Sequence, residues 1–401
     1  MNREELFANQ KDNALCAYPF FSIRNGQSHG YAPCCWAMRQ QLVGPHTDTV
    51  FDYFDGPEAV ELRRGMLSGE ITNHCKAVCY ICHRREKESG TSPRLMMPLD
   101  HTMLDLYNDD GTYNHKHDED HPPRINLELN FYGNYCNLEC YGCHPADSTT
   151  REKRLEKLSE LRVSEGRDDW FTRKQNDVSW LPTDLRKVGP EQFERLVEDI
   201  VDNADRVGAM GFCGGEPMLM KSHFQVLDAL VLAGKAKHMK LNYVSNMTLW
   251  DMDKMEKYTK EFKFINLQWS CDGLGDRNHY LRYPTKWDET WANVQAMQEW
   301  CRETGKGIVQ ATYTPSLLSL FKIKEVFAFF EENGLKERPF TIYNRLENPR
   351  FLQVNNLPEP IKEQIFDDVN SVCESTAKDM MRPCKEGSWE IAKEYFDDLD
   401  R

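Results

Sequence analysis

Three cysteines near the middle of the chain are spaced as ligands of one metal centre. They lie in the run Cys136-Asn-Leu-Glu-Cys140-Tyr-Gly-Cys143, a C-x3-C-x2-C pattern. Three thiolates this close together can hold one face of an iron–sulfur cubane and leave one metal position without a protein ligand. A structural zinc ion normally has four protein ligands, and the nearest candidate for a fourth, His144, is adjacent to Cys143 and poorly placed to complete a tetrahedron. The spacing therefore favours an iron–sulfur cluster with one open position over zinc.

A second group of cysteines lies near the start of the chain. The sequence has 14 cysteines, and those of the early region are Cys16, Cys34, Cys35, Cys75, Cys79 and Cys82. A disulfide framework is typical of short secreted domains, whereas this chain has 401 residues, a polar first segment and tightly clustered cysteines. The early region is therefore predicted to be a small domain stabilised by metal. An iron–sulfur cluster and a zinc ribbon both remain open, because two separated cysteine pairs also suit tetrahedral zinc.

Two short polar motifs follow predicted strands in the second half of the chain. Gly211-Phe-Cys-Gly214-Gly215-Glu216-Pro217 combines glycines, which allow close backbone approach, with a carboxylate that can accept hydrogen bonds from an ammonium group. Ser245-Asn246 places a hydroxyl and an amide at the end of the next strand, where they suit ribose hydroxyls. Each motif also has a plain structural interpretation as a turn.

Two further motifs bring an acidic and a basic residue to the following strand end. They are Ser270-Cys-Asp272-Gly273 and Tyr280-Leu-Arg282-Tyr-Pro284. Asp272 and Arg282 could orient a substrate, or they could form a helix cap and a surface ion pair. Cys213 and Cys271 lie inside motifs at strand ends, and buried free cysteines of this kind usually act as small apolar residues.

Strand-like and helix-like segments alternate after Pro123. The predicted strands cover residues 125–131, 209–213, 240–245, 264–270, 308–314 and 339–343. The predicted helices cover residues 150–161, 189–207, 223–233 and 287–304. Such alternation is typical of β/α units that form a parallel sheet.

Several of these strands have a polar residue at every second position. The residues concerned are Asn126, Glu128 and Asn130, then Asn266, Gln268 and Ser270, then Gln310, Thr312 and Thr314. A parallel strand between two helix layers would be apolar on both faces, so one face is predicted to line a polar cavity. The pattern favours an α/β fold of the partial (β/α)6 TIM-type barrel kind over an open doubly wound sheet. Its chemistry is expected at the carboxyl ends of the strands.

Taken together, the motifs resemble those of the radical S-adenosylmethionine (radical SAM) enzymes over residues 124–348. The resemblance implies that the three central cysteines hold a [4Fe-4S] cluster whose open iron is chelated by the amino and carboxylate groups of S-adenosylmethionine. It also implies contacts to the rest of that molecule: Tyr141 toward the adenine, Gly214, Gly215 and Glu216 at the methionine amino group, and Ser245 and Asn246 at the ribose. Asp272 and Arg282 resemble the S-x-D-G and R-x-P elements of the peptide-modifying branch.

The early cysteine region, residues 15–88, resembles a SPASM or twitch module, which holds an auxiliary iron–sulfur cluster. The resemblance implies the ligands Cys16, Cys34, Cys79 and Cys82, with Cys35 as an alternative to Cys34 and Cys75 as a spare thiolate. In the family this module usually follows the barrel, whereas here it precedes it.

The resemblance also implies an activity. S-adenosylmethionine would be cleaved to methionine and a 5′-deoxyadenosyl radical, which abstracts hydrogen from a substrate, and an external reductant such as a flavodoxin or ferredoxin would supply the electron. A peptide or protein substrate is favoured, with a small molecule such as an amino sugar as the alternative. A non-catalytic scaffold stabilised by zinc or an iron–sulfur cluster is the remaining hypothesis.

Composition and patterning complete the predicted organisation. An auxiliary cluster domain (1–90) is expected to be followed by a polar linker (91–123), the core barrel (124–350) and a segment of two acidic amphipathic helices without chemistry (351–401). The net charge of −14 repels polyanions, so no nucleic-acid or membrane partner is expected. No run approaches about 18 apolar residues and the first residues do not resemble a signal peptide, so a cytoplasmic location is expected.

Overall fold

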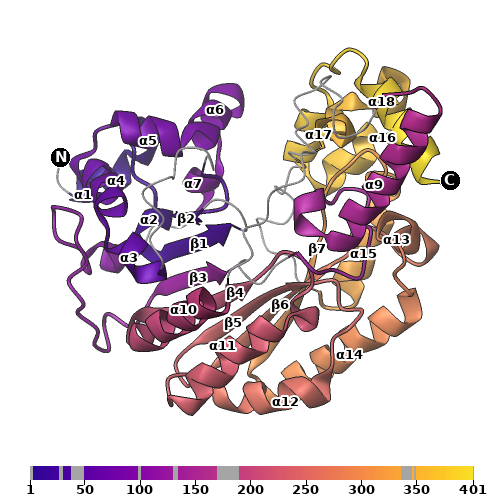
Figure 1. Cartoon of the computed structure of the whole chain (residues 1–401). Helices are drawn as coiled ribbons and strands as arrows, with labels where there is room; N and C mark the ends of the chain where they lie inside the picture. The colour runs from indigo at the N-terminus through magenta and orange to yellow at the C-terminus, as the bar shows by residue number, and fades with distance from the viewer. Residues whose placement is uncertain are drawn as a thin grey trace.

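One mixed sheet runs through the centre of the molecule (Figure 1). The computed structural model describes residues 3–26, 30–37, 49–97, 101–129, 134–168, 189–335, 346 and 349–400, and within them the strand order is β2-β1-β3-β4-β5-β6-β7. The strands are β1 (Ser22–Gly26), β2 (Gly30–Ala32), β3 (Ile125–Leu129), β4 (Val207–Phe212), β5 (Lys240–Ser245), β6 (Phe264–Ser270) and β7 (Gly307–Thr312). Each pairs in parallel with its neighbours except β2, which is antiparallel to β1 at the edge. The predicted α/β class with a largely parallel sheet is confirmed.

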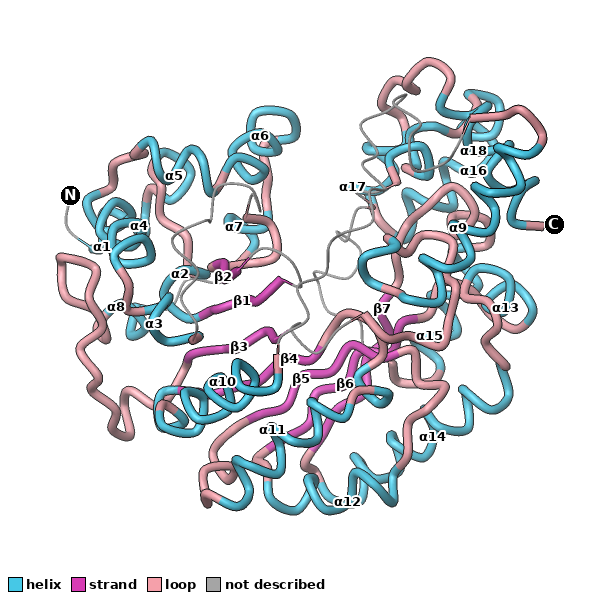
Figure 2. The backbone as a smooth tube through the Cα atoms, in the orientation of Figure 1, coloured by secondary structure: helices cyan, strands magenta, loops and turns pink. Residues whose placement is uncertain are grey.

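Helices α10, α11, α12 and α14 lie along one side of this sheet, the lower side in Figures 1 and 2. The helices between and after the strands are α9 (Thr149–Ser164), α10 (Pro190–Asp202), α11 (Lys221–Leu232), α12 (Met252–Glu261), α13 (Asp276–Leu281), α14 (Trp287–Thr304) and α15 (Ile323–Glu332). Strands β5 and β6 and helix α14 have the predicted bounds, and the other predicted elements differ by a few residues at their ends. The predicted strand 339–343 and residues 130–131 lie outside the described residues.

The strands of the sheet have one apolar and one polar face. On the apolar face, Leu127, Tyr243 and Leu267 are fully buried in the same core as the helices. On the other face the strand register aligns one row across the sheet, and its members are Arg24, Glu128, Gly211, Asn242 and Asn266. The alternation expected from the sequence is confirmed, because side chains of successive strand residues point to opposite faces.

The N-terminal segment contributes β1 and β2 to the sheet. Its helices are α1 (Arg3–Ala8), α2 (Tyr18–Phe21), α3 (Val50–Phe54), α4 (Pro57–Ser68), α5 (Asn73–Val78), α6 (Tyr80–Ser89), α7 (Pro93–Met96) and α8 (His101–Leu104). Ile23 of β1 is fully buried and lies opposite Leu127 of β3. The cysteine-bearing segment is therefore joined to the central sheet by strand pairing, which the sequence analysis did not predict.

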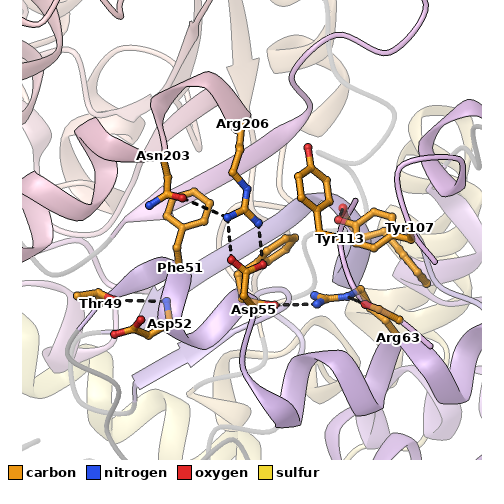
Figure 3. Close-up of polar contacts among 12 residues, drawn as sticks. Thr49, Phe51, Asp52, Asp55, Arg63, Tyr107, Tyr113, Asn203 and Arg206 are labelled. Atoms are coloured by element: carbon orange, nitrogen blue, oxygen red, sulfur yellow. Dashed lines mark hydrogen bonds and ion pairs between the residues drawn. The ribbon is translucent and has the colours of Figure 1, made fainter. Parts of the chain in front are cut away.

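An ion pair between a buried arginine and an exposed aspartate also connects the N-terminal segment to the sheet (Figure 3). Arg206, at the end of a short helix before β4, donates hydrogen bonds of 2.7 Å to both carboxylate oxygens of Asp55. Its guanidinium lies 4.6 Å from the ring centroids of Phe51 and of Tyr113. Bidentate geometry and aromatic stacking make this a strong contact for a guanidinium.

The segment predicted as a polar linker is packed against the N-terminal helices. Leu104, Leu106 and Tyr107 are buried, and the Tyr107 hydroxyl donates a hydrogen bond to the carbonyl oxygen of Phe20. Tyr107 also forms a bridge with Tyr113. A solvated connector was expected because residues 91–123 include many charged residues. The composition of the segment does not single out the few apolar residues that pack.

The C-terminal segment contains three helices where two were predicted. They are α16 (Glu359–Val372), α17 (Glu374–Met380) and α18 (Ser388–Leu399). Figure 1 shows α18 beside α9, at the end of the molecule opposite the N-terminal helices. No helix among the described residues is both long and apolar enough to cross a membrane.

Candidate active site

A cavity opens at the carboxyl ends of β4, β5, β6 and β7. It encloses about 970 Å³ of empty space, its mouth included. Of the site residues expected from the sequence in the core region, all but Glu216 line its wall, namely Cys136, Cys140, Tyr141, Cys143, Gly214, Gly215, Ser245, Asn246, Asp272 and Arg282. Segments more than 100 positions apart in the chain thus meet at one edge of the sheet. This is the edge at which parallel α/β folds place their sites.

The loop with the three cysteines is fixed by backbone hydrogen bonds to the chain after α13. The amide of Tyr141 donates to the carbonyl of Leu281 at 3.1 Å, and that of Glu139 donates to the carbonyl of Tyr283 at 2.6 Å. The Ser148 hydroxyl, which caps α9, donates to the carbonyl of Leu138 at 2.9 Å. These bonds hold a loop without regular structure in one conformation.

Each central cysteine has a polar neighbour of its own. The Sγ of Cys136 accepts a hydrogen bond from the amide of Leu138 at 3.5 Å, and the Asn246 side-chain amide lies 3.9 Å from it. The Sγ of Cys140 lies 3.7 Å from Nη1 of Arg282. Burial raises the pKa of the Cys136 thiol to about 11, and the neighbouring Cys140 adds to this effect. Only the thiolate is a good metal ligand, so these buried thiols must lose their protons to bind a metal. A nearby cation would favour that loss.

The tandem glycines are required by packing against the cysteine loop. Gly214 and Gly215 have φ angles of 81° and 59°. A Cβ on Gly215 would lie 2.5 Å from the carbonyl oxygen of Tyr135. The Gly215 amide donates to the carbonyl of Asp147 at 3.0 Å, so the two loops are in direct contact. Only glycine combines this backbone conformation with so close an approach.

Glu216 lies behind the cavity wall and is fully buried. Its carboxylate accepts hydrogen bonds from the Ser245 hydroxyl at 2.9 Å, the Asn246 amide at 2.8 Å and the Met218 amide at 3.3 Å. Burial raises the pKa of Glu216 to about 7, although these hydrogen bonds oppose the shift. In this structure the carboxylate joins the end of β5 to the loop after β4; the contact to a methionine amino group expected from the sequence stays a prediction.

Asn246 belongs to a small amide network at the end of β5. Its Nδ2 donates to Oδ1 of Asn137 at 3.0 Å, and its Oδ1 accepts from the amide of Thr248 at 2.9 Å. The Asn137 amide in turn donates to the Thr248 hydroxyl at 2.8 Å. This network fixes the residues next to Cys136, and Ser245 and Asn246 both face the cavity.

Asp272 and Arg282 form a direct ion pair beside Cys140. Arg282 Nε donates to Asp272 Oδ2 at 2.8 Å, and the other carboxylate oxygen accepts from the amide of Thr314 at 2.9 Å. Burial alone would lower the pKa of Arg282, but the Asp272 carboxylate and the nearby Cys140 raise it well above its usual value. The guanidinium therefore stays charged next to the sulfur. The surface ion pair considered from the sequence is in fact a largely buried one.

The C-terminal helix closes one side of the cavity, which the sequence analysis did not foresee. Phe396 lines the cavity and lies 5.9 Å from the Tyr141 ring, measured between ring centroids. The Tyr395 hydroxyl donates to the backbone carbonyl of Tyr141 at 3.0 Å, and the Tyr141 hydroxyl donates to Asp400 at 3.3 Å. The expectation of a helical cover without a role at the site therefore needs correction. Local periodicity identifies an amphipathic helix but not the surface on which it packs.

Five of the early cysteines come together in the N-terminal segment. Cys16, Cys34, Cys75, Cys79 and Cys82 are near enough for each to influence the ionisation of another member of the group. The group includes all the predicted ligands.

Cys75 interacts directly with another cysteine of this group, whereas the sequence suggested that it was a spare thiolate. A hydrogen bond with Cys79 lowers the pKa of Cys75 to about 5, burial opposes the shift, and a contact of 3.9 Å to Nε2 of His83 supports it. Cys35 also acts on the ionisation of Cys34, and it is itself influenced by the guanidinium of Arg24 and the thiol of Cys213. Within the described residues, no three His, Cys, Asp or Glu side chains lie close enough to hold a single metal ion.

Comparisons with known proteins identify only distant structural likenesses. No family model and no curated protein matches the chain. The structure described as native anSMEcpe with bound AdoMet shares 18% identity and a TM-score of 0.35, covering 53% of this chain and 50% of that one. Streptococcus suis SuiB bound to S-adenosylmethionine shares 17% identity and a TM-score of 0.34, covering 63% and 48%. The chain spans about half the length of these proteins, and TM-scores this low do not assign it to a family.

Proposed function

We propose that the chain is a radical SAM enzyme. The observation that supports this most directly is the convergence of Cys136, Cys140 and Cys143 on one cavity with the strand-end motifs that follow them in the chain. Local sequence similarity alone would not require residues so far apart to meet. The donor set fits an iron–sulfur cluster with one open iron, because three cysteines of one loop face the cavity and could supply three thiolates.

Different residues around the cavity are proposed to bind the cluster and the parts of S-adenosylmethionine. Cys136, Cys140 and Cys143 would hold a [4Fe-4S] cluster, which when bound would deliver the electron that cleaves S-adenosylmethionine to methionine and a 5′-deoxyadenosyl radical. Ser245 and Asn246 present polar groups for the ribose. Tyr141 and Phe396 provide aromatic surface for the adenine and keep water from the site.

The sheet is proposed to form a partial (β/α)6 barrel whose polar face holds the substrate. The polar row across β1 and β3 to β6 supports this, because Arg24, Glu128 and Asn242 in it are half-buried and lie on the face opposite the apolar one. A peptide or protein substrate is favoured by the S-x-D-G-like segment, in which Asp272 and Arg282 form their ion pair. The polar row itself would also suit an amino sugar, so the substrate class rests on the motif.

The N-terminal cysteines are proposed to hold an auxiliary [4Fe-4S] cluster. The predicted ligands Cys16, Cys34, Cys79 and Cys82 lie in one group, which supports a single centre. Cys75 and His83 lie beside this group and could complete a zinc site instead. The metal content of the protein therefore distinguishes an auxiliary iron–sulfur cluster from zinc. A flavodoxin or ferredoxin is proposed as the electron donor.

The test is reductive cleavage of S-adenosylmethionine by the anaerobically reconstituted chain. With dithionite as reductant, the wild-type protein is expected to release 5′-deoxyadenosine, measured by mass spectrometry. A variant with Cys136, Cys140 and Cys143 replaced by alanine is expected to release none. A matched variant with Cys213→Ala and Cys301→Ala, which changes cysteines outside both groups, should retain the activity. A wild-type protein without turnover, or a triple variant that still cleaves, would contradict the proposal and favour a non-catalytic scaffold.

A further inference from the structure

A buried arginine without hydrogen-bond partners lies behind the cysteine loop. Arg151 is in the first turn of α9, three residues after the capping Ser148, and none of its side chain is exposed. All three of its guanidinium nitrogens lack a hydrogen-bond partner among the described residues. Its guanidinium stacks over the ring of Tyr395, 5.2 Å from the ring centroid. A buried charge in this condition is strongly destabilising unless another group compensates it.

The Tyr395 ring that stacks on Arg151 belongs to the residue that holds the cysteine loop, because its hydroxyl donates to the Tyr141 carbonyl, between Cys140 and Cys143, at 3.0 Å. Burial lowers the pKa of Arg151 to about 10, whereas the anionic forms of Cys143 and Cys140 act in the opposite direction. The Arg151 side chain is not part of the cavity wall, and its nitrogens are not hydrogen-bonded to the sulfur atoms. It is therefore not placed to bind a ligand in the cavity.

A second guanidinium, that of Arg282, approaches the same loop from the cavity side. It is 3.7 Å from the Sγ of Cys140, but its charge is already balanced by Asp272 at 2.8 Å. Arg151 has no carboxylate of this kind within hydrogen-bonding distance. Of these two cations, Arg151 is the one without a hydrogen-bonded counterion in the described part of the chain; the negative charges that act on it are the anionic forms of Cys143 and Cys140 and, after them, Glu139.

We propose that Arg151 is a positioning residue that compensates the negative charge of the cluster at Cys140 and Cys143 and raises its reduction potential. This inference rests on the proposed function. A cluster held by three thiolates is anionic, and one-electron reduction by an external donor adds a further negative charge. Net charge and hydrogen bonds to the sulfurs set the potential of such a centre, so a fixed cation stabilises the reduced form more than the oxidised form.

The test is an anaerobic redox titration with dithionite, followed by electron paramagnetic resonance. The central cluster is identified as the signal that changes when S-adenosylmethionine is added, which separates it from any auxiliary cluster. Arg151→Gln removes the charge, and its central cluster is expected to be about tenfold less reduced at a given potential. This corresponds to a midpoint about 59 mV more negative. Arg151→Lys keeps the charge and should stay within roughly threefold of the wild type.

The control is Lys157→Gln, which removes the same charge from an exposed position on the same helix and should leave the midpoint unchanged. Failure of Arg151→Gln to retain iron while Arg151→Lys retains it would also support the charge requirement. An unchanged midpoint in Arg151→Gln, an equal shift in Lys157→Gln, or loss of iron in both Arg151 variants would overturn it. A wild-type protein without any signal sensitive to S-adenosylmethionine would instead refute the proposed function.

Discussion

The hydroxyl of Tyr395 donates a hydrogen bond of 3.0 Å to the backbone carbonyl of Tyr141, 254 positions earlier in the chain. Tyr141 lies between Cys140 and Cys143, so a residue of the last helix holds the loop of the candidate cluster site. Both side chains are buried, and no solvent competes for this bond. The C-terminal helix is consequently part of the site rather than an appendage to it.

Loss of that single hydroxyl should loosen the cysteine loop. Tyr395→Phe keeps the ring that stacks on Arg151 but leaves the Tyr141 carbonyl unpaired, so unfolding should become easier by about 1–2 kcal/mol. Denaturant unfolding measures the change. The matched control Tyr283→Phe alters an exposed tyrosine and should cost less than about 0.5 kcal/mol. Equal effects of the two variants would show that the Tyr395 hydroxyl has no special role.

The pH dependence of stability should carry a signature of Glu216. Its pKa rises from 4.5 to about 7 on folding because the carboxyl is buried. A raised pKa in the folded state gives a stabilisation that is complete below about pH 4.5 and is lost as the pH rises through about 7. The lost amount corresponds to roughly 3 kcal/mol.

The measurement is the free energy of unfolding of wild type and of Glu216→Gln between about pH 4.5 and 8. The glutamine cannot ionise, so the free energy of unfolding of the variant should rise relative to that of the wild type as the pH increases across this window. Glu256→Gln is the control. The ion pair with Lys260 lowers the pKa of this exposed glutamate, so its contribution to the pH dependence of stability occurs below this pH window. A constant difference between wild type and Glu216→Gln would contradict the prediction.

Metal analysis distinguishes the two proposals for the N-terminal cysteines. Protein purified without oxygen should contain about eight irons per chain and little zinc if both centres are four-iron clusters. One zinc with about four irons would assign the N-terminal group to zinc and leave the central proposal intact. Zinc without iron would contradict both.

Residues of the polar face should affect product formation more than stability. Gln268, Gln310 and Thr312 are half-buried, and changing Gln268 and Gln310 to leucine should cost little stability because neither packs in the apolar core. Release of 5′-deoxyadenosine should continue, whereas conversion of a substrate should fall. Loss of soluble protein that still contains its iron would instead show that these are core polar residues with satisfied hydrogen bonds.

Sequence patterns predicted the elements whose signals are local. The bounds of β5, β6 and α14 follow from alternating apolar residues and from helical spacing, and they match the structure. Strand β1 was missed because Ser22–Gly26 is short and Ile23 is its one large apolar residue, so it shows no alternation; its pairing with β3 stabilises it.

The candidate site was predictable in its motifs but not in its supports. The central cysteines, Ser245 and Asn246 were named from spacing and meet at one cavity. Arg151, however, is one of many charged residues in α9, and such a sequence predicts a solvent-exposed helix. In the structure Tyr395 of α18 packs over it, and the contact of α18 with α9 joins parts of the chain about 245 positions apart.

The position of β1 in the sheet has a consequence for folding during synthesis. Arg24 of β1 and Glu128 of β3 are neighbours in the sheet but 104 positions apart in the chain. The N-terminal segment leaves the ribosome well before its partner strand exists, and it must wait with an unpaired strand edge. Contacts of such long range slow folding, and exposed edges pair readily with other chains. Deleting the N-terminal segment would leave the same problem at the edge of β3, so neither part of the molecule is expected to stay soluble without the other.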